Sequence, residues 1–211
     1  MSASAEQQTA QILNVPNQLT AARLVLSIVV FALIPLGYYV AAMVVFVIAA
    51  GTDWIDGYWA RKYNQVTQLG RMFDPFVDKI IICGTFILLA AEMHASTSIP
   101  WFGKVAGWMA VVVVGREMLV TALRGFIEQS GGDFSANMAG KLKMVFQCAA
   151  VVAALLALNH VSAASTSEAD LPPWLLWSLV VSVWLAVGST VYSGVGYLIA
   201  AGRYLLPNKS E

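Results

Sequence analysis

Six long apolar stretches, separated by short connections, are the feature that most constrains how this chain can fold. They run roughly over Leu19–Tyr39, Ala41–Arg61, Phe73–Ala91, Val105–Phe126, Leu142–Leu158 and Trp174–Ala200. Each approaches the length of about 20 residues that an α-helix needs to cross a bilayer. Only 11% of the residues are charged, whereas soluble domains carry about 25%. The sequence therefore predicts an all-α integral membrane protein with six transmembrane helices in one domain, residues 1–211.

Basic residues mark every second connection between these stretches and the segment that follows the last one. They are Arg61, Lys62, Arg71, Lys141, Lys143, Arg203 and Lys209. The alternate connections hold Lys104 alone. Because basic residues stay on the cytoplasmic side, this pattern predicts that both termini and the basic connections face the cytoplasm. Tryptophans near the opposite ends fit an interfacial aromatic belt.

The ends of the chain and the remaining composition add less. Residues 1–13 are expected to be a mobile tail, and Asn14–Gln18 a short interfacial helix before the first span. The N-terminus lacks a basic region, so we expect no cleaved signal peptide. The formal net charge of zero gives no sign of nucleic-acid binding. Cys83 and Cys148 lie in apolar runs and are expected to be packing residues.

Four aspartates lie where charges are costly. Asp53 and Asp56 end the second stretch, and Asp74 and Asp78 open the third. An ionisable residue within a membrane segment indicates a functional site unless it serves in a structural ion pair. At helical spacing Asp53 and Asp56 share a narrow arc, and Asp74 and Asp78 are one turn apart. Antiparallel helices bring the two pairs together, and their mutual repulsion favours a hard divalent cation such as Mg²⁺ or Mn²⁺.

Small residues accompany the acids. Gly57, Ala60 and Gly70 fall on the same helical faces and leave room for a ligand to approach. The segment from Asp53 to Gly57 superficially resembles a calcium loop, but its intervening residues are apolar and the required later glutamate is missing.

The stretch DWIDGYWARKYNQVTQLGRMFDPFVD resembles the CDP-alcohol phosphotransferase family. It fits the signature D-x2-D-G-x2-A-R-x8-G-x3-D-x3-D at all eight positions: Asp53, Asp56, Gly57, Ala60, Arg61, Gly70, Asp74 and Asp78. The resemblance extends over most of the chain, because that family also has six transmembrane helices and a cytoplasm-facing site. Such enzymes occur in the bacterial inner membrane, and homodimers are common among them.

Three looser motifs are similar to those of the phosphatidylglycerophosphate synthases within the family. They are NVPNQLTAAR near the N-terminus, GREMLVTALR in the fourth stretch, and GKLK with Gln147 beyond it in the fifth. The last motif differs from the family pattern at Met144, where the family often has threonine. The resemblance implies transfer of a phosphatidyl group from CDP-diacylglycerol to sn-glycerol 3-phosphate, with release of CMP.

The resemblance also implies roles for individual residues. Asp53, Asp56 and Asp74 are expected to be the principal metal ligands, with Asp78 contributing to a second ion and acting as general base. The donor is expected to contact Asp53, Gly57, Ala60, Arg61 and Gly70. The acceptor phosphate requires cations, for which the candidates are Arg116, Arg124, Lys141 and Lys143, with Thr20 and Arg23 near the entrance. Glu117 is expected to pair with Arg116 or Arg124.

Other interpretations remain open at this point. A sister enzyme such as a cardiolipin synthase or an inositol-phosphate transferase would use the same aspartates with a different acceptor. An ion or metal transporter also places acids in membrane helices, but it needs polar residues along a path through the bilayer. A purely structural membrane protein would leave the four acids without an explanation.

Overall fold

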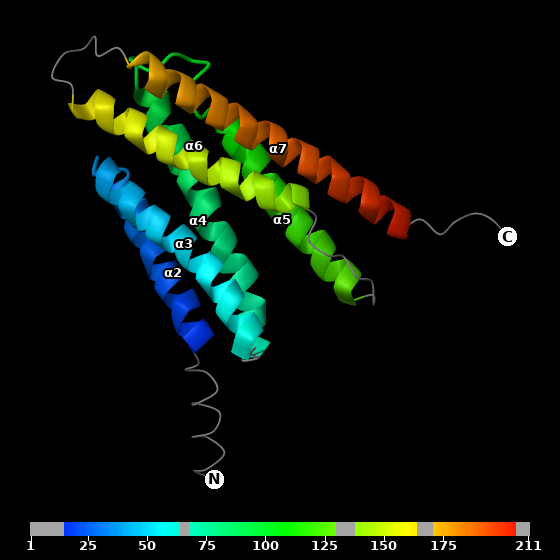
Figure 1. Ribbon diagram of the computed structural model, residues 1–211. Coiled ribbons are helices and arrows are strands. Elements are labelled where there is room, and N and C mark those ends of the chain that lie inside the picture. Colours follow the sequence, from blue (N-terminus) through cyan, green and yellow to red (C-terminus); the bar gives the residue numbers. More distant parts are fainter. Residues whose placement is uncertain (1–14, 64–67, 130–137, 164–170, 206–211) are drawn as a thin grey trace.

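The computed structural model describes residues 15–63, 68–129, 138–163 and 171–205. For some helical residues, among them 53–63 and 68–78, it describes only the backbone. The described ranges contain six α-helices and no strand (Figure 1): α2 Val15–Leu33, α3 Tyr39–Tyr63, α4 Gln68–Ala95, α5 Gly107–Gln129, α6 Met138–Ala163 and α7 Pro173–Leu205. The prediction of six helices is confirmed, and each of the six apolar stretches corresponds to one of them.

The helices extend beyond most of the predicted stretches, because polar residues at their ends continue the helix. One detail of the prediction was wrong. Val15–Gln18 were expected to belong to a separate interfacial helix, yet they form the first turn of α2, which continues without a break to Leu33. Residues 1–13 and Asn14 lie outside the described part of the chain.

The chain runs up and down through a bundle with two distinct ends (Figure 1). At one end lie the α2–α3 and α4–α5 connections, the end of α6 and the start of α7, together with the exposed Trp101, Trp108, Trp174 and Trp177. We call this the tryptophan end. At the other end lie the start of α2, the end of α3 with the neighbouring start of α4, the end of α5 and the end of α7. We call it the aspartate end, because positions 53, 56, 74 and 78 lie in the parts of α3 and α4 nearest to it.

Helix α6 connects the two halves of the bundle. It packs along α7 in the most extensive helix–helix contact and also touches α3 and α4, while α2 packs against α3 and α4. The centre is filled by fully buried side chains, including Phe46, Phe86 and Leu155. Helices α2 and α4 approach closely at Gly84, where an added Cβ would lie 2.2 Å from Cζ of Phe31.

The outer surface of the bundle is apolar. Ile28, Val111 and Val145 are among many large aliphatic side chains that point outward and are exposed. Soluble monomers rarely expose large contiguous apolar patches. By length and composition, Leu142–Ala163 in α6 and Pro173–Gly202 in α7 can each cross a membrane, and shorter apolar helical segments lie in α2 and α3. These features favour a membrane protein.

Candidate active site

The backbone of the acid-bearing segments is helical, as predicted. Positions 53 and 56 lie in α3, and positions 74 and 78 lie in α4. Their side chains are outside the described residues, as are those of Gly57, Ala60, Arg61 and Gly70. Their predicted roles therefore remain predictions.

The described parts of α3 and α4 bear on which faces these positions occupy. On α3 the buried residues Ala42, Phe46 and Ala49 recur at intervals of four and three. Continued at the same spacing, the series reaches positions 53, 56 and 60. On α4 the buried residues Met93, Leu89 and Ile82 form a comparable series that leads back to positions 78 and 74. Helical periodicity alone thus predicts that the four positions lie on the inner faces of α3 and α4.

The four positions are also at a similar depth in the bundle. Positions 53 and 56 precede the end of α3 at Tyr63, and positions 74 and 78 follow the start of α4 at Gln68, by six to ten residues. At 1.5 Å per residue this corresponds to about 9–15 Å from those helix ends. Only residues 64–67 join the two helices, so the aspartate-bearing ends cannot be far apart.

A buried ion cluster lies beside this region. The carboxylate of Glu117 on α5 accepts contacts from three cations on three helices: Lys79 on α4, Arg116 on α5 and Lys143 on α6. The Lys79 Nζ lies 2.8 Å from Oε2, and the Arg116 Nη1 lies 3.3 Å from Oε1. Lys143 Nζ donates to Oε1. We refer to Lys79, Arg116, Glu117 and Lys143 as the ion cluster.

Arg116 is also held from the side of α7. Its Nη2 donates a hydrogen bond to Oγ of Ser193, and its guanidinium carbon lies 5.4 Å from the ring centroid of Tyr197. Gly194 allows this approach, because a Cβ there would lie 3.1 Å from Cγ of Arg116. The guanidinium is therefore fixed by a carboxylate, a hydroxyl and an aromatic face.

Arg124 lies two turns further along α5 and shares Tyr197. Its Nη2 donates a hydrogen bond to the phenol oxygen at 3.1 Å, and its guanidinium carbon lies 5.9 Å from the ring centroid. A Cβ on Gly140, at the start of α6, would lie 3.6 Å from the same phenol oxygen. Arg124 is thus linked through Tyr197 to Arg116 of the ion cluster, and we refer to Arg116, Arg124 and Lys143 as the basic surface.

Two further polar features support the region. Gln147 Nε2 on α6 donates to Thr190 Oγ1 on α7 at 3.1 Å, and both are buried. This bond joins α6 to α7 one turn from Lys143 and from Ser193.

Thr20 and Arg23 on α2 are buried as well, so their predicted place at an entrance finds no support in their exposure.

The structure brings together part of the predicted acceptor site. Arg116, Arg124 and Lys143 lie in one region, as predicted, whereas the side chain of Lys141 is outside the described residues. Glu117 pairs with Arg116, one of its two predicted partners. Lys143 had also been counted among the connection charges that orient the chain. The structure places Lys143 within α6 and not in the connection, with its side chain buried against Glu117, while the predicted orientation stays a prediction.

Sequence reasoning missed Lys79, Ser193 and Tyr197 as members of this site, and it gave Glu117 too few partners. Lys79 had a usable signal, since a lysine beside Asp78 in an apolar helix requires a counter-charge. Ser193 and Tyr197 had none, because a serine and a tyrosine in an apolar helix are ordinary. Neither Cys83 nor Cys148 forms a disulfide within the described residues, consistent with packing roles.

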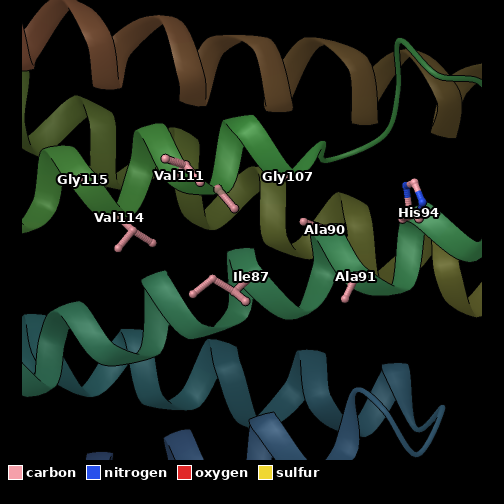
Figure 2. Close-up of a pocket in the computed structure, with 9 residues that line it drawn as sticks. Ile87, Ala90, Ala91, His94, Gly107, Val111, Val114 and Gly115 are labelled. Atoms are coloured by element: carbon pink, nitrogen blue, oxygen red, sulfur yellow. The ribbon is translucent and has the colours of Figure 1, made fainter.

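A pocket among the described residues has a different character. It lies between α4 and α5 in the half of the bundle near the tryptophan end (Figure 2). Figure 2 shows Ile87, Ala90 and Ala91 on α4 facing Val111 and Val114 on α5, with His94 at one edge. These walls are apolar and lack a carboxylate or a lysine or arginine. The pocket therefore suits a hydrocarbon group and cannot be the site of phosphate chemistry.

An apolar helical bundle with buried cations beside an acidic pair of helix segments is typical of a membrane-embedded enzyme that handles phosphates. The chain belongs to the CDP-alcohol phosphatidyltransferase family, whose model matches residues 13–192. This confirms the family indicated by the aspartate signature.

Curated relatives within the family are similar over nearly the whole chain. The CDP-diacylglycerol–glycerol-3-phosphate 3-phosphatidyltransferase of Bacillus subtilis (strain 168) is 34% identical over 200 residues, which cover 87% of this chain and 93% of the relative. The protein of the same name from Pseudomonas fluorescens is 32% identical, with 92% of each chain covered. The one from Escherichia coli (strain K12) is 28% identical, covering 92% of this chain and 97% of the relative.

Proposed function

We propose that this protein transfers the phosphatidyl group of CDP-diacylglycerol to sn-glycerol 3-phosphate, giving phosphatidylglycerol phosphate and CMP. The names of its relatives support this reaction. The observation that carries it to this chain is the basic surface of Arg116, Arg124 and Lys143, of which Arg116 and Lys143 are buried. It is held next to the helix that bears Asp74 and Asp78. An acceptor with its own phosphate needs such a surface, and guanidinium groups pair with phosphate oxygens bidentately.

The acidic segments are suited to metal ions. Four carboxylates at similar depth on two inward-facing helical series supply the hard oxygen ligands that Mg²⁺ and Mn²⁺ prefer. We assign Asp53, Asp56 and Asp74 as the principal ligands of one ion and Asp78 as a contributor to a second. When bound, the ions would neutralise the charge of the donor pyrophosphate and of the leaving CMP.

The protein's own groups account for the remaining chemistry. Asp78 accepts the proton of the acceptor hydroxyl as that oxygen bonds to the β-phosphorus of the donor. The bond from this phosphorus to the bridging oxygen then breaks, and CMP departs with that oxygen. Arg61 is placed on the donor phosphates by the family signature, and Gly57, Ala60 and Gly70 leave room for the nucleotide. Positioned proton transfer contributes about 10²–10⁴-fold to such rates.

The acceptor binds with its phosphate on the basic surface and its hydroxyl toward Asp78. Lys79 of the ion cluster follows Asp78 directly in α4, so the two positions differ by one helical residue, about 1.5 Å in rise. This arrangement supports a short distance between the bound phosphate of the acceptor and the β-phosphorus of the donor that its hydroxyl attacks. We extend the surface to Lys141, which is two residues from Lys143.

The membrane arrangement follows from the bundle and the charges. We propose that all six helices span a cytoplasmic membrane, with the aspartate end in the cytoplasm and the tryptophan end at the opposite interface. The exposed tryptophans at one end and the apolar surface between the ends support this orientation. The acyl chains of the donor remain in lipid. A homodimer is the expected state from the family.

The test is CMP release from CDP-diacylglycerol by the purified protein in lipid nanodiscs, measured with a panel of acceptors. We expect release with sn-glycerol 3-phosphate at a rate at least about tenfold above that with phosphatidylglycerol, myo-inositol phosphate or glycerol. Release with phosphatidylglycerol instead would identify a cardiolipin synthase, and a requirement for inositol phosphate would identify another sister enzyme. Either result would overturn the proposed acceptor. Transport of divalent cations without CMP release would overturn the enzyme assignment.

A further inference from the structure

We infer that Glu117 is a positioning residue that holds the cations of the acceptor site in their binding arrangement. The inference rests on the proposed function, because it assigns the ion cluster to an acceptor phosphate. Glu117 itself touches neither substrate. It acts through Arg116 and Lys143, and it ties them to Lys79 on the aspartate-bearing helix.

The contacts of Glu117 are the first reason. A carboxylate offers about four lone-pair directions. Here Oε1 receives Lys143 Nζ and Arg116 Nη1, while Oε2 receives Lys79 Nζ at 2.8 Å and Arg116 Nη1 at 3.4 Å. Cations thus occupy both oxygens from several directions. A carboxylate in this state is a poor proton acceptor and has little capacity for a metal ion, so a chemical role for Glu117 is disfavoured.

The burial of the cluster is the second reason. The Glu117 side chain is 2% exposed and that of Lys79 is 27% exposed. Lys79 therefore lies toward the more open side of the carboxylate, whereas the side chains of Arg116 and Lys143, 8% and 5% exposed, are almost as enclosed as Glu117 itself. Each ammonium has three donor hydrogens and the guanidinium has five. Contact with one carboxylate leaves donors for a phosphate on the other side of the cations.

Electrostatics requires such a residue. Arg116 and Lys143 are both buried, and like charges at close range in a medium of low dielectric constant repel strongly. Removing one partner of a buried ion pair leaves an uncompensated charge and is strongly unfavourable. Without Glu117, the three cations would separate or take other rotamers before an acceptor arrived. With it, they are arranged in advance, and the acceptor does not have to gather them.

The link to α4 is the third reason. Lys79 is the residue after Asp78, the proposed base, and its ion pair with Glu117 joins α4 to α5. Lys143 extends the connection to α6. A displacement of the phosphate-binding cations relative to Asp78 would misplace the attacking hydroxyl. Glu117 therefore couples the position of the acceptor phosphate to the position of the base.

The decisive variant is Glu117→Gln, which keeps the shape of the side chain and removes its charge. Initial rates of CMP release should be measured against each substrate in turn. We expect the KM for sn-glycerol 3-phosphate to rise at least tenfold while the KM for CDP-diacylglycerol changes less than twofold. Glu117→Asp keeps the charge on a shorter side chain and should give an intermediate KM.

Glu92→Gln is the matched control, since Glu92 accepts a hydrogen bond from Tyr39 at 3.3 Å near the tryptophan end. It should leave both KM values unchanged.

The KM values distinguish positioning from other roles. A merely structural glutamate would lower the fraction of active enzyme, and hence the apparent kcat, without altering the KM for either substrate. A glutamate that only offsets positive charge would weaken acceptor binding in the wild type, so its removal would lower the KM for sn-glycerol 3-phosphate. An unchanged or lowered KM in Glu117→Gln would overturn the inference. If that variant does not fold, Glu117→Asp decides: a KM raised for the acceptor alone supports the inference, and unchanged values overturn it.

Binding of inorganic phosphate separates this inference from the proposed function. Phosphate should raise the thermal unfolding temperature of the wild type in a saturable manner, and Glu117→Gln should require at least tenfold more phosphate for half of the effect. This measurement needs no turnover. If the wild type fails to use sn-glycerol 3-phosphate but shows the difference in phosphate binding, the proposed function fails and the role of Glu117 stands. If the wild type turns over sn-glycerol 3-phosphate normally but the wild type and Glu117→Gln bind phosphate equally, the proposed function stands and the role of Glu117 fails.

Discussion

Arg124 on α5 and Tyr197 on α7 are joined in two ways. The guanidinium donates a hydrogen bond to the phenol oxygen at 3.1 Å, and its carbon lies 5.9 Å from the ring centroid. Arg116 lies 5.4 Å from the centroid of the same ring. One aromatic side chain therefore organises two arginines, two turns apart, that sequence reasoning had assigned to the acceptor phosphate.

Tyr197→Phe and Tyr197→Ala separate the two contributions. Phenylalanine keeps both cation–π contacts and removes a hydrogen bond to a charged group, which contributes about 1.5 kcal/mol. We expect the KM for sn-glycerol 3-phosphate to rise about tenfold. Alanine also removes the cation–π contacts, about 0.5–1 kcal/mol each, and should raise it further. Steady-state kinetics of CMP release provide the measurement.

Tyr192 offers the matched control for Tyr197. It lies on the same helix, and its side chain is 77% exposed. Tyr192→Phe should leave the KM for both substrates unchanged. Equal effects of Tyr192→Phe and Tyr197→Phe would show that the change acts through α7 in general and would contradict the assigned role of the ring.

The contact between Gly84 and Phe31 leads to a prediction about stability. A Cβ at position 84 would lie 2.2 Å from the ring of Phe31, so Gly84→Ala forces the ring to move. Overpacking of this kind costs about 1–3 kcal/mol. We expect a lower midpoint of thermal unfolding in detergent, and Phe31→Leu in the same chain should restore much of it.

Gly188 on α7 is the control for this experiment, because a Cβ there would meet nothing within 4 Å. Gly188→Ala should be neutral or stabilising by up to about 1 kcal/mol, since alanine favours the helix. A Gly84→Ala variant as stable as Gly188→Ala would show that α2 and α4 do not approach as closely as described.

The helices could be predicted from the sequence because each apolar stretch has about the 20 residues that a membrane-spanning helix needs. The helix ends could not, since Gln68, Gly70 and Arg71 interrupt the apolar pattern at the start of α4, yet the helix continues through them. The first turn of α2 was assigned to a separate helix for a similar reason. Its sequence VPNQ is half polar and predicts an entry segment, and Pro16 is tolerated in a first helical turn.

The candidate site shows a sharper limit of sequence reasoning. The four aspartates are recognisable because their spacing along two helices is local information. The ion cluster depends on how α4, α5 and α6 are rotated and packed, which no local spacing specifies. Lys143 therefore resembled a connection charge until its contact with Glu117 was known. Ser193 and Tyr197 approach Arg116 only because α7 crosses α5, with Gly194 leaving the space.

Asp78→Asn tests the assigned general base. The amide is close in size to the carboxylate but cannot accept the acceptor proton at useful rates. We expect CMP release to fall by about 10²–10⁴-fold, with the thermal unfolding midpoint close to that of the wild type. Glu92→Gln, a neutralised carboxylate at the far end of the same helix, should keep full activity. More than a tenth of wild-type activity in Asp78→Asn would contradict the assignment.

Metal removal tests the four aspartates as a group. Four carboxylates brought together as proposed would repel one another, and divalent cations would relieve this repulsion while neutralising the donor pyrophosphate. Treatment with EDTA should therefore abolish CMP release, and Mg²⁺ or Mn²⁺ should restore it. Asp53→Asn removes one proposed ligand and should raise the Mg²⁺ concentration required for half-maximal activity about tenfold or more, as is typical when a metal site is perturbed. Tyr192→Phe should leave that concentration unchanged. Turnover that persists in EDTA, or an unchanged Mg²⁺ requirement in Asp53→Asn, would show that these acids serve the protein in some way other than metal binding.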